Sequence, residues 1–159
     1  MTVDGCITKV YNFPMDTERV MADLLRDLGH LSRLITQVAG PSLTRTEATL
    51  LGAVAERPRR ITDLVRLVGL TQPRITTMVQ SLEQQGLTLR EADPADGRAV
   101  RIRLTEQGRA LIEERQRRIS DALVASLSEQ RLDADEVVAE AAAKVRVLVQ
   151  ALEPAPAAR

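Results

Sequence analysis

The chain has 159 residues, of which 44% are hydrophobic and 28% charged, the composition of an ordinary globular chain with one domain or one domain plus dimerising extensions. Its 22 basic and 22 acidic residues balance, so net charge alone does not indicate nucleic-acid binding. No run approaches the roughly 18 consecutive apolar residues of a membrane span, and the first residues lack the basic-then-apolar order of a signal peptide. We therefore expect a cytoplasmic protein with no membrane partner.

The content of reactive side chains is low. Cys6 is the single cysteine and His30 the single histidine. One cysteine excludes an internal disulfide framework, and the two residues together are too few for a zinc site built from Cys and His ligands. A nucleophile, a base and an orienting group cannot be assembled from these two residues, and no Gly-rich phosphate loop occurs. We expect no metal site, no cofactor and no enzymatic activity.

Helical periodicity begins at residue 17. Apolar residues recur at steps of three and four over 17–38, and Gly40 with Pro41 ends this run. In the next helix Thr44 and Glu47 have the spacing of a capping box, and Pro58 follows its end. The apolar positions of the two helices are Val20, Leu24, Leu28, Leu31, Ile35 and Val38, and then Leu50, Leu51 and Val54.

Two short helices follow, separated by a tight turn. The first, 61–69, has Thr62 as the expected cap and Gly69 as the stop, and the second has Thr71 as the cap and Gly86 as the stop. Such a pair describes a helix-turn-helix, whose second helix enters the DNA major groove. The expected buried faces are Leu64, Val65 and Val68 in the first helix, and Ile75, Met78, Val79 and Leu82 in the second.

A β-hairpin is predicted directly after this motif. The segments 87–91 and 100–104 alternate in character, and "ADPADGRA" between them is rich in turn residues. A hairpin in this position is a wing. We expect its second strand to direct Val100, Ile102 and Leu104 to the core and Arg101 and Arg103 outward.

Two long helices complete the pattern. Thr105 caps a helix that runs to about Leu127, and a second helix spans 135–152, ahead of a tail at 153–159 that we expect to be disordered. The last helix has apolar residues at steps of 3, 4, 3 and 4, the spacing of a coiled-coil seam, at Val138, Ala141, Val145, Leu148 and Leu152.

Charge is distributed unevenly along the chain. Residues 57–103 contain nine Arg and five acidic residues, a net charge of +4, and the remainder of the chain carries −4. The basic part coincides with the predicted helix-turn-helix and wing, which favours DNA as the partner of that part.

The sequence resembles the MarR family of winged-helix transcription regulators over roughly residues 17–152. The resemblance rests on the helix after Leu43-Thr44, on "LEQQGL" at 82–87, and above all on "DPADGRAVRIRLTEQG" at 93–108. It implies a mainly α winged-helix fold, with an extension at 1–16, dimerisation helices at 17–42 and 105–152, and a DNA-binding domain at 43–104. The expected protein is a homodimeric DNA-binding regulator, a ligand-responsive repressor of a pseudo-palindromic operator.

The outer face of the second helix and the wing are the expected DNA contacts. That face is polar and free of carboxylates, and Gln and Arg offer bidentate partners for adenine and guanine. The resemblance implies that the wing-tip Arg98 enters the minor groove, where a guanidinium is attracted, and that Asp96 pairs with a wing Arg and stabilises the wing. The full set of expected DNA-binding residues is Thr71, Gln72, Arg74, Thr76, Thr77, Gln80, Arg98 and Arg101.

Further interpretations concern the ends of the chain and another use of the fold. His30 or Arg33 could contact a small-molecule effector, since the family often binds aromatic acids beside its dimer helices. Cys6 could act as a redox sensor, although Lys9 is the one basic residue close to it in sequence that would lower its thiol pKa. The winged helix could instead serve as a protein-interaction module, and the start site could be Met1 or Met15.

Overall fold

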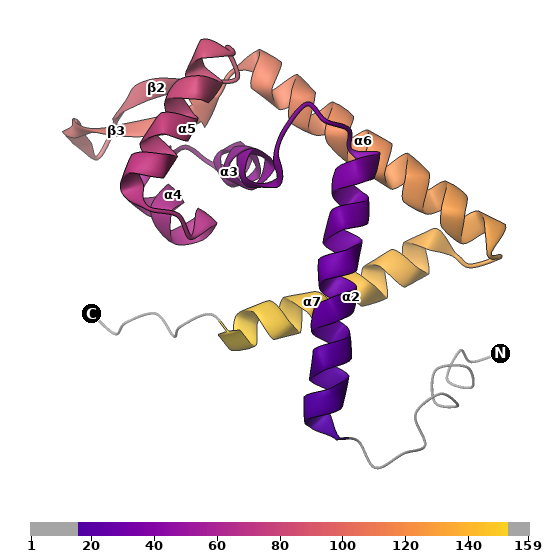
Figure 1. The fold of residues 1–159 in the computed structure, drawn as a ribbon. Coiled ribbons are helices and arrows are strands. Elements are labelled where there is room, and N and C mark those ends of the chain that lie inside the picture. Colours follow the sequence, from indigo (N-terminus) through magenta and orange to yellow (C-terminus); the bar gives the residue numbers. More distant parts are fainter. Residues whose placement is uncertain (1–15, 153–159) are drawn as a thin grey trace. The chain divides into compact units, whose positions relative to one another are not determined.

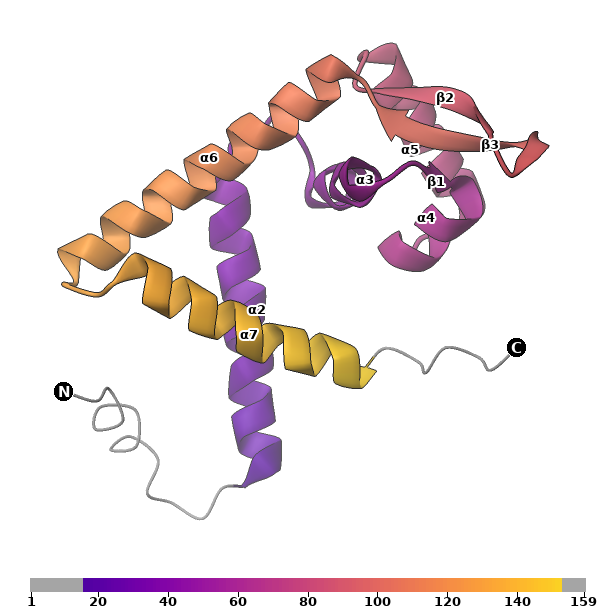
Figure 2. The same ribbon diagram turned by 180° about the vertical axis from the view of Figure 1, so that it is seen from behind.

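The computed structural model describes residues 16–152 (Figures 1 and 2), and the chain divides into two compact units, residues 1–44 and 45–159. In the first unit the predicted helix is confirmed as α2, Thr17–Val38. The carboxylate of Asp16 caps it by accepting a hydrogen bond from the Glu18 amide at 3.2 Å. Cys6, most of the expected extension and the tail at 153–159 lie outside the described residues.

The second unit has a winged-helix architecture. A three-stranded antiparallel sheet, in the order β1-β3-β2, lies among its helices, and the two longer strands form the hairpin. In chain order the elements are α3 (Arg45–Glu56), β1 (Arg59–Arg60), α4 (Ile61–Val68), α5 (Gln72–Gln84), β2 (Thr88–Asp93), β3 (Asp96–Leu104), α6 (Glu106–Glu129) and α7 (Ala134–Leu152).

The core of this unit is aliphatic. The chain contains one Tyr, one Phe and no Trp, so branched aliphatic side chains must fill the space between α3, α4, α5 and the sheet. These residues come largely from the predicted apolar faces, because a periodicity of 3.6 places them on the inner side of each helix. The fully buried large side chains are Leu50, Leu51, Leu64, Ile75, Val79, Leu82 and Ile102.

The helix-turn-helix is formed by α4 and α5. Gly69 ends α4 in the left-handed conformation, with φ of 73°, where a residue with a Cβ is disfavoured. Thr71 is the N-cap residue of α5, although its hydroxyl makes no capping hydrogen bond. The expectation that Thr62 caps α4 is wrong: the helix begins at Ile61, and Arg60 is the N-cap because it ends the short strand β1.

The wing is longer than predicted. Strand β2 extends to Asp93 and β3 begins at Asp96, with a register irregularity between Ala92 and Asp93. Ile102 and Leu104 are buried as expected, but Val100 is 43% exposed, so its predicted core position is wrong. Val100 lies on the same face of β3 as Ile102 and Leu104, but it belongs to the outer half of the hairpin, which extends beyond the core.

The junction between the wing and α6 explains an unusual glycine. The Thr105 hydroxyl accepts a hydrogen bond from the Gly108 amide at 3.0 Å and donates one to the Gly86 carbonyl at 2.6 Å. The Thr105 amide bonds the Leu87 carbonyl at 3.1 Å, which draws the start of α6 against the end of the helix-turn-helix. A Cβ at Gly108 would lie 2.1 Å from that same carbonyl oxygen, so this position requires glycine.

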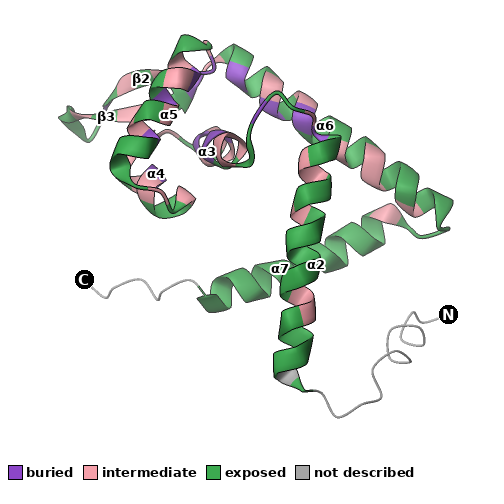
Figure 3. Cartoon of the chain, viewed as in Figure 1, coloured by how far each residue is buried: buried purple, intermediate pink, exposed green. Residues whose placement is uncertain are grey.

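Burial falls steeply along the last two helices. The first half of α6 contributes buried residues, whereas α7 has none (Figure 3). Among residues 16–152, no helix is long and apolar enough to cross a membrane.

Candidate nucleic-acid interface

The outer face of α5 is polar and exposed. Thr71, Gln72, Arg74, Thr77 and Gln80 all lie at the surface, and Thr76 is half-buried. The hydroxyls of Thr76 and Thr77 donate to the backbone carbonyls of Gln72 and Pro73, at 2.9 and 3.1 Å, as is common for Thr inside a helix. The side chains of Gln72 and Gln80 make no hydrogen bond with the rest of residues 16–152, so their amides face solvent with donors and acceptors available.

The electrostatics of this face are cationic. The first turn of α5 contains no acidic residue, and Arg74 has no carboxylate partner within the described residues. Glu83, nearer the end of the helix, bonds Arg90 of β2 at 3.0 Å. The free helix N-terminus and the unpaired guanidinium therefore both favour an anion here, which accounts for an Arg where the helix dipole alone disfavours it.

The wing arginines differ in their environments. Arg101 and Arg103 both pair with Glu91 of the neighbouring strand, at 2.8 and 3.0 Å, so one carboxylate partly compensates both charges. Arg101 is half-buried, and its Nε atom is buried without a hydrogen-bond partner. Arg98, at the tip, is exposed and has no ion-pair partner in the described part of the chain. The tip residue is thus the wing cation best placed to meet an external anion.

A pair of residues absent from the sequence-based site supports the wing. Arg60 Nε donates to Asp93 Oδ2 at 2.6 Å, and the Asp93 side chain is only 8% exposed. The Ala95 amide and the Arg60 guanidinium both bond this carboxylate and hold the pKa of Asp93 below its usual range. Asp96, the predicted wing-stabilising residue, accepts from the Arg98 amide at 3.2 Å, and its nearest guanidinium is that of Arg60 at 3.8 Å.

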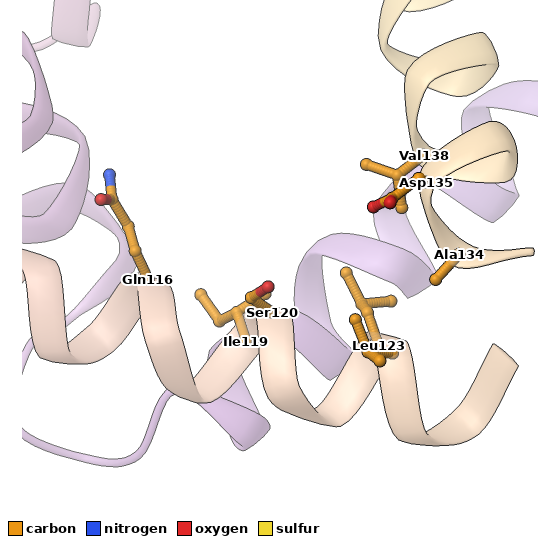
Figure 4. A pocket seen from close by; sticks show the side chains of 8 residues that line it. Gln116, Ile119, Ser120, Leu123, Ala134, Asp135 and Val138 are labelled. Carbon is orange, nitrogen blue, oxygen red and sulfur yellow. The ribbon is translucent and has the colours of Figure 1, made fainter. Parts of the chain in front are cut away.

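A groove of about 270 Å³ lies between α6 and α7 (Figure 4). Its lining is mainly apolar, with Asp135 as its one charged group. Neither His30 nor Arg33, both exposed on α2, belongs to this lining. Within residues 16–152 no group of three His, Cys, Asp or Glu side chains is placed to hold a metal ion. The groove is lined by Gln116, Ile119, Ser120, Leu123, Val124, Ala134, Asp135 and Val138.

One buried charge stands apart from these surfaces. Arg115 of α6 is 8% exposed, and its Nη1 atom is buried without a hydrogen-bond partner. A buried N–H group without a partner opposes folding, because the hydrogen bond to water that it loses is not replaced.

A helix-turn-helix followed directly by a β-hairpin defines the second unit as a winged-helix domain. A family model described as the MarR family matches residues 42–99. This part of the chain is therefore similar to the MarR family, and the match confirms the resemblance found in the sequence.

Individual relatives agree with this assignment. The chain is 30% identical over 105 residues to the HTH-type transcriptional repressor NicR of Pseudomonas putida. The aligned stretch covers 64% of this chain and 66%, just under two thirds, of that repressor.

Solved structures share the fold over a longer stretch. A mutant of MarR from E. coli is 22% identical with a TM-score of 0.64, covering 86% of this chain and 99% of that one. The PcaV regulator of Streptomyces coelicolor, crystallised with its natural ligand, is 27% identical with a TM-score of 0.58, covering 87% and 99%.

Proposed function

We propose that the protein is a homodimeric transcription regulator that binds double-stranded DNA sequence-specifically and represses until a small molecule releases it. The observation that carries the proposal is the pairing, in one winged-helix unit, of a carboxylate-free polar α5 face with an unpaired arginine at the wing tip. Gln72, Arg74 and Gln80 supply the donors and acceptors that read base edges, and Arg98 supplies the cation for the minor groove. Thr71, Thr76, Thr77 and Arg101 complete the proposed DNA-binding set.

The state of the long helices supports a dimer. Exposed apolar residues follow α2 over its length, and α7 has no buried residue at all. Exposed apolar residues gathered along a helix are typical of a protein–protein interface. Val138, Val145, Leu148 and Leu152 of the predicted seam are all exposed, and Val138 also lines the groove between α6 and α7. We propose that a second copy covers these helices.

Ligand control is proposed from the relatives. NicR is named a repressor, and PcaV was crystallised with a natural ligand. In this chain, the ligand would bind preferentially to a form of the dimer in which the spacing of the two α5 helices does not match one turn of DNA. Ligand binding would then lower the population of the DNA-binding form and release the DNA. His30 and Arg33 remain the proposed ligand contacts, with a role for Cys6 as the alternative form of control.

A selection from random DNA tests this function. Purified protein is mixed with a pool of random duplexes, and the bound fraction is sequenced over several rounds. We expect an enriched pseudo-palindrome whose half-sites lie roughly 10 bp apart. Arg98→Ala serves as the comparison and should fold normally but bind the enriched duplex at least about five-fold more weakly. Absence of any enriched sequence would refute a sequence-specific regulator and favour the protein-interaction alternative.

A further inference from the structure

Arg60 connects the wing to the helix-turn-helix. Its backbone pairs with Arg101 of β3 and forms the N-cap of α4, so the main chain at this residue belongs to both the sheet and the helix motif. Its side chain extends to the hairpin, where Nε donates to Asp93 at 2.6 Å and Nη2 lies 3.8 Å from Asp96. One guanidinium therefore approaches both carboxylates at the base of the wing tip.

These two carboxylates shape the tip. Asp93 Oδ1 accepts a hydrogen bond from the Ala95 amide at 2.9 Å, and Asp96 Oδ1 accepts one from the Arg98 amide at 3.2 Å. Each closes a turn between residues i and i+2, as Asp side chains do in tight turns. Asp93 is also the partner of Asp96 in the hairpin register, at the irregularity that ends the regular pairing. The backbone position of Arg98 thus depends on both carboxylates.

We propose that Arg60 and Asp93 are positioning residues that hold the wing tip, and with it Arg98, in a fixed relation to α4 and α5. Arg60 sits at the start of α4, and α4 packs against α5, so the contact runs from the wing tip to the helix that reads DNA. This inference rests on the proposed function for its effect on DNA binding, but the positioning itself is a property of the free protein.

The alternative role of Arg60 is a direct phosphate contact. Its side chain is 40% exposed and carries a charge in the basic part of the chain. The two roles predict opposite effects of neutralising Asp93. If charge alone matters, removal of a carboxylate near DNA strengthens binding. If Asp93 and Arg60 hold the tip in place, Asp93→Asn weakens binding although it makes the protein more positive.

The first experiment measures the tip without DNA. Amide hydrogen exchange of the full chain is compared between the natural protein and the Arg60→Met and Asp93→Asn variants. We expect faster exchange at Ala95 and Arg98 in both variants, with unchanged exchange at Val79 in the buried face of α5. Unchanged exchange at the tip in both variants would overturn the proposal. Because no DNA is present, this result stands even if the proposed function fails.

The second experiment measures affinity for the duplex enriched by selection. We expect Arg60→Met and Asp93→Asn each to weaken binding by about ten-fold, similar to loss of one specific contact. In an Arg98→Ala background they should cost little more, because the residue they position is gone. Arg66→Met on the exposed side of α4 is the matched control for loss of charge.

Each outcome of the second experiment has a defined meaning. Additive losses with Arg98→Ala, equal losses in Arg60→Met and Arg66→Met, or tighter binding by Asp93→Asn would each assign Arg60 to phosphate contact and overturn the positioning role. If the natural protein binds no DNA, the proposed function fails, and the exchange data alone decide whether the tip is held.

Discussion

Substitution of Gly108 by Ala tests the account of the junction between the wing and α6. Helix propensity alone favours Ala by about 1 kcal/mol. The added Cβ, however, would lie 2.1 Å from the Leu87 carbonyl oxygen and 3.1 Å from Leu104 Cδ2. Since ordinary contact begins at 3.4 Å, α6 or the backbone at Leu87, just before β2, must move by about 1.3 Å, and this neighbour is backbone rather than a flexible side chain.

The expected cost follows from that movement. Overpacking of this kind destabilises by about 1 to 3 kcal/mol, and this contact falls at the upper end because a backbone atom must give way. The same carbonyl accepts the Thr105 amide, whose hydrogen bond contributes about 1 kcal/mol more if it is lost. After the gain in propensity, Gly108→Ala should lower the free energy of unfolding by about 2 to 3 kcal/mol.

Urea denaturation, followed by helical circular dichroism at one protein concentration, measures this change. Gly52→Ala in α3 is the control, because an added Cβ there meets nothing within 4 Å and should stabilise the protein by up to about 1 kcal/mol. If Gly108→Ala is as stable as the natural protein or more stable, the close approach of α6 to Leu87 is not a constraint, and this reasoning is refuted.

Three further predictions concern charge and assembly. Arg115→Met should raise the free energy of unfolding by about 1 to 3 kcal/mol in a urea titration, because it removes the buried Nη1 group that has no hydrogen-bond partner. Arg118→Met, on an exposed partner of Glu114, should change it little, and a destabilised Arg115→Met would contradict this reasoning. Because the pKa of Asp93 is lowered in the folded protein, its carboxylate stabilises the fold at pH values above the unfolded pKa of about 3.9, and this stabilisation is lost as pH falls through the lower folded pKa. The difference in unfolding free energy between the natural protein and Asp93→Asn should therefore shrink below about pH 4 and should not shrink near neutrality. Leu148→Glu should convert a dimer to a monomer in sedimentation velocity, whereas Gln150→Glu, off the seam, should not, and a dimeric Leu148→Glu would place the interface elsewhere.

Periodicity was sufficient to predict the helix-turn-helix. Ile75, Val79 and Leu82 are buried as their spacing indicated, because a helix that packs on one side must place its apolar residues there. Turn chemistry likewise located the hairpin, since Asp, Pro and Gly cluster where the two strands must reverse. These features depend on local sequence, and the structure bears them out.

The missed features depend on contacts distant in sequence. Arg60 and Asp93 are 33 positions apart, and no local pattern links them. Strand β1 has two residues, too few to show alternation, yet it moves the start of α4 from the predicted cap Thr62 to Arg60. Val100 has the parity of a core residue but lies where the hairpin extends beyond the core. The requirement for glycine at position 108 could not be explained from local sequence either, because the carbonyl that this residue faces belongs to Leu87, 21 residues earlier.

The proposed DNA interface was likewise predicted only in the part that depends on local sequence. Helical face and residue type indicated Arg74 as a DNA contact, and the family resemblance implied Arg98. Both are exposed without carboxylate partners in the described part of the chain. The sequence did not distinguish them from Arg101, which Glu91 engages across the hairpin. Whether a wing arginine is free or paired depends on the residue opposite it, and the strand register is needed to identify that residue.

The most direct test of the central claim is fluorescence anisotropy of the full chain with the duplex enriched by selection and with a scrambled duplex of equal length, over a series of salt concentrations. A sequence-specific regulator should bind more weakly as salt rises, steeply so because phosphate contacts release counterions, and should prefer the enriched duplex by at least about a thousand-fold. Equal, weak binding to both duplexes at every salt concentration would contradict the central claim.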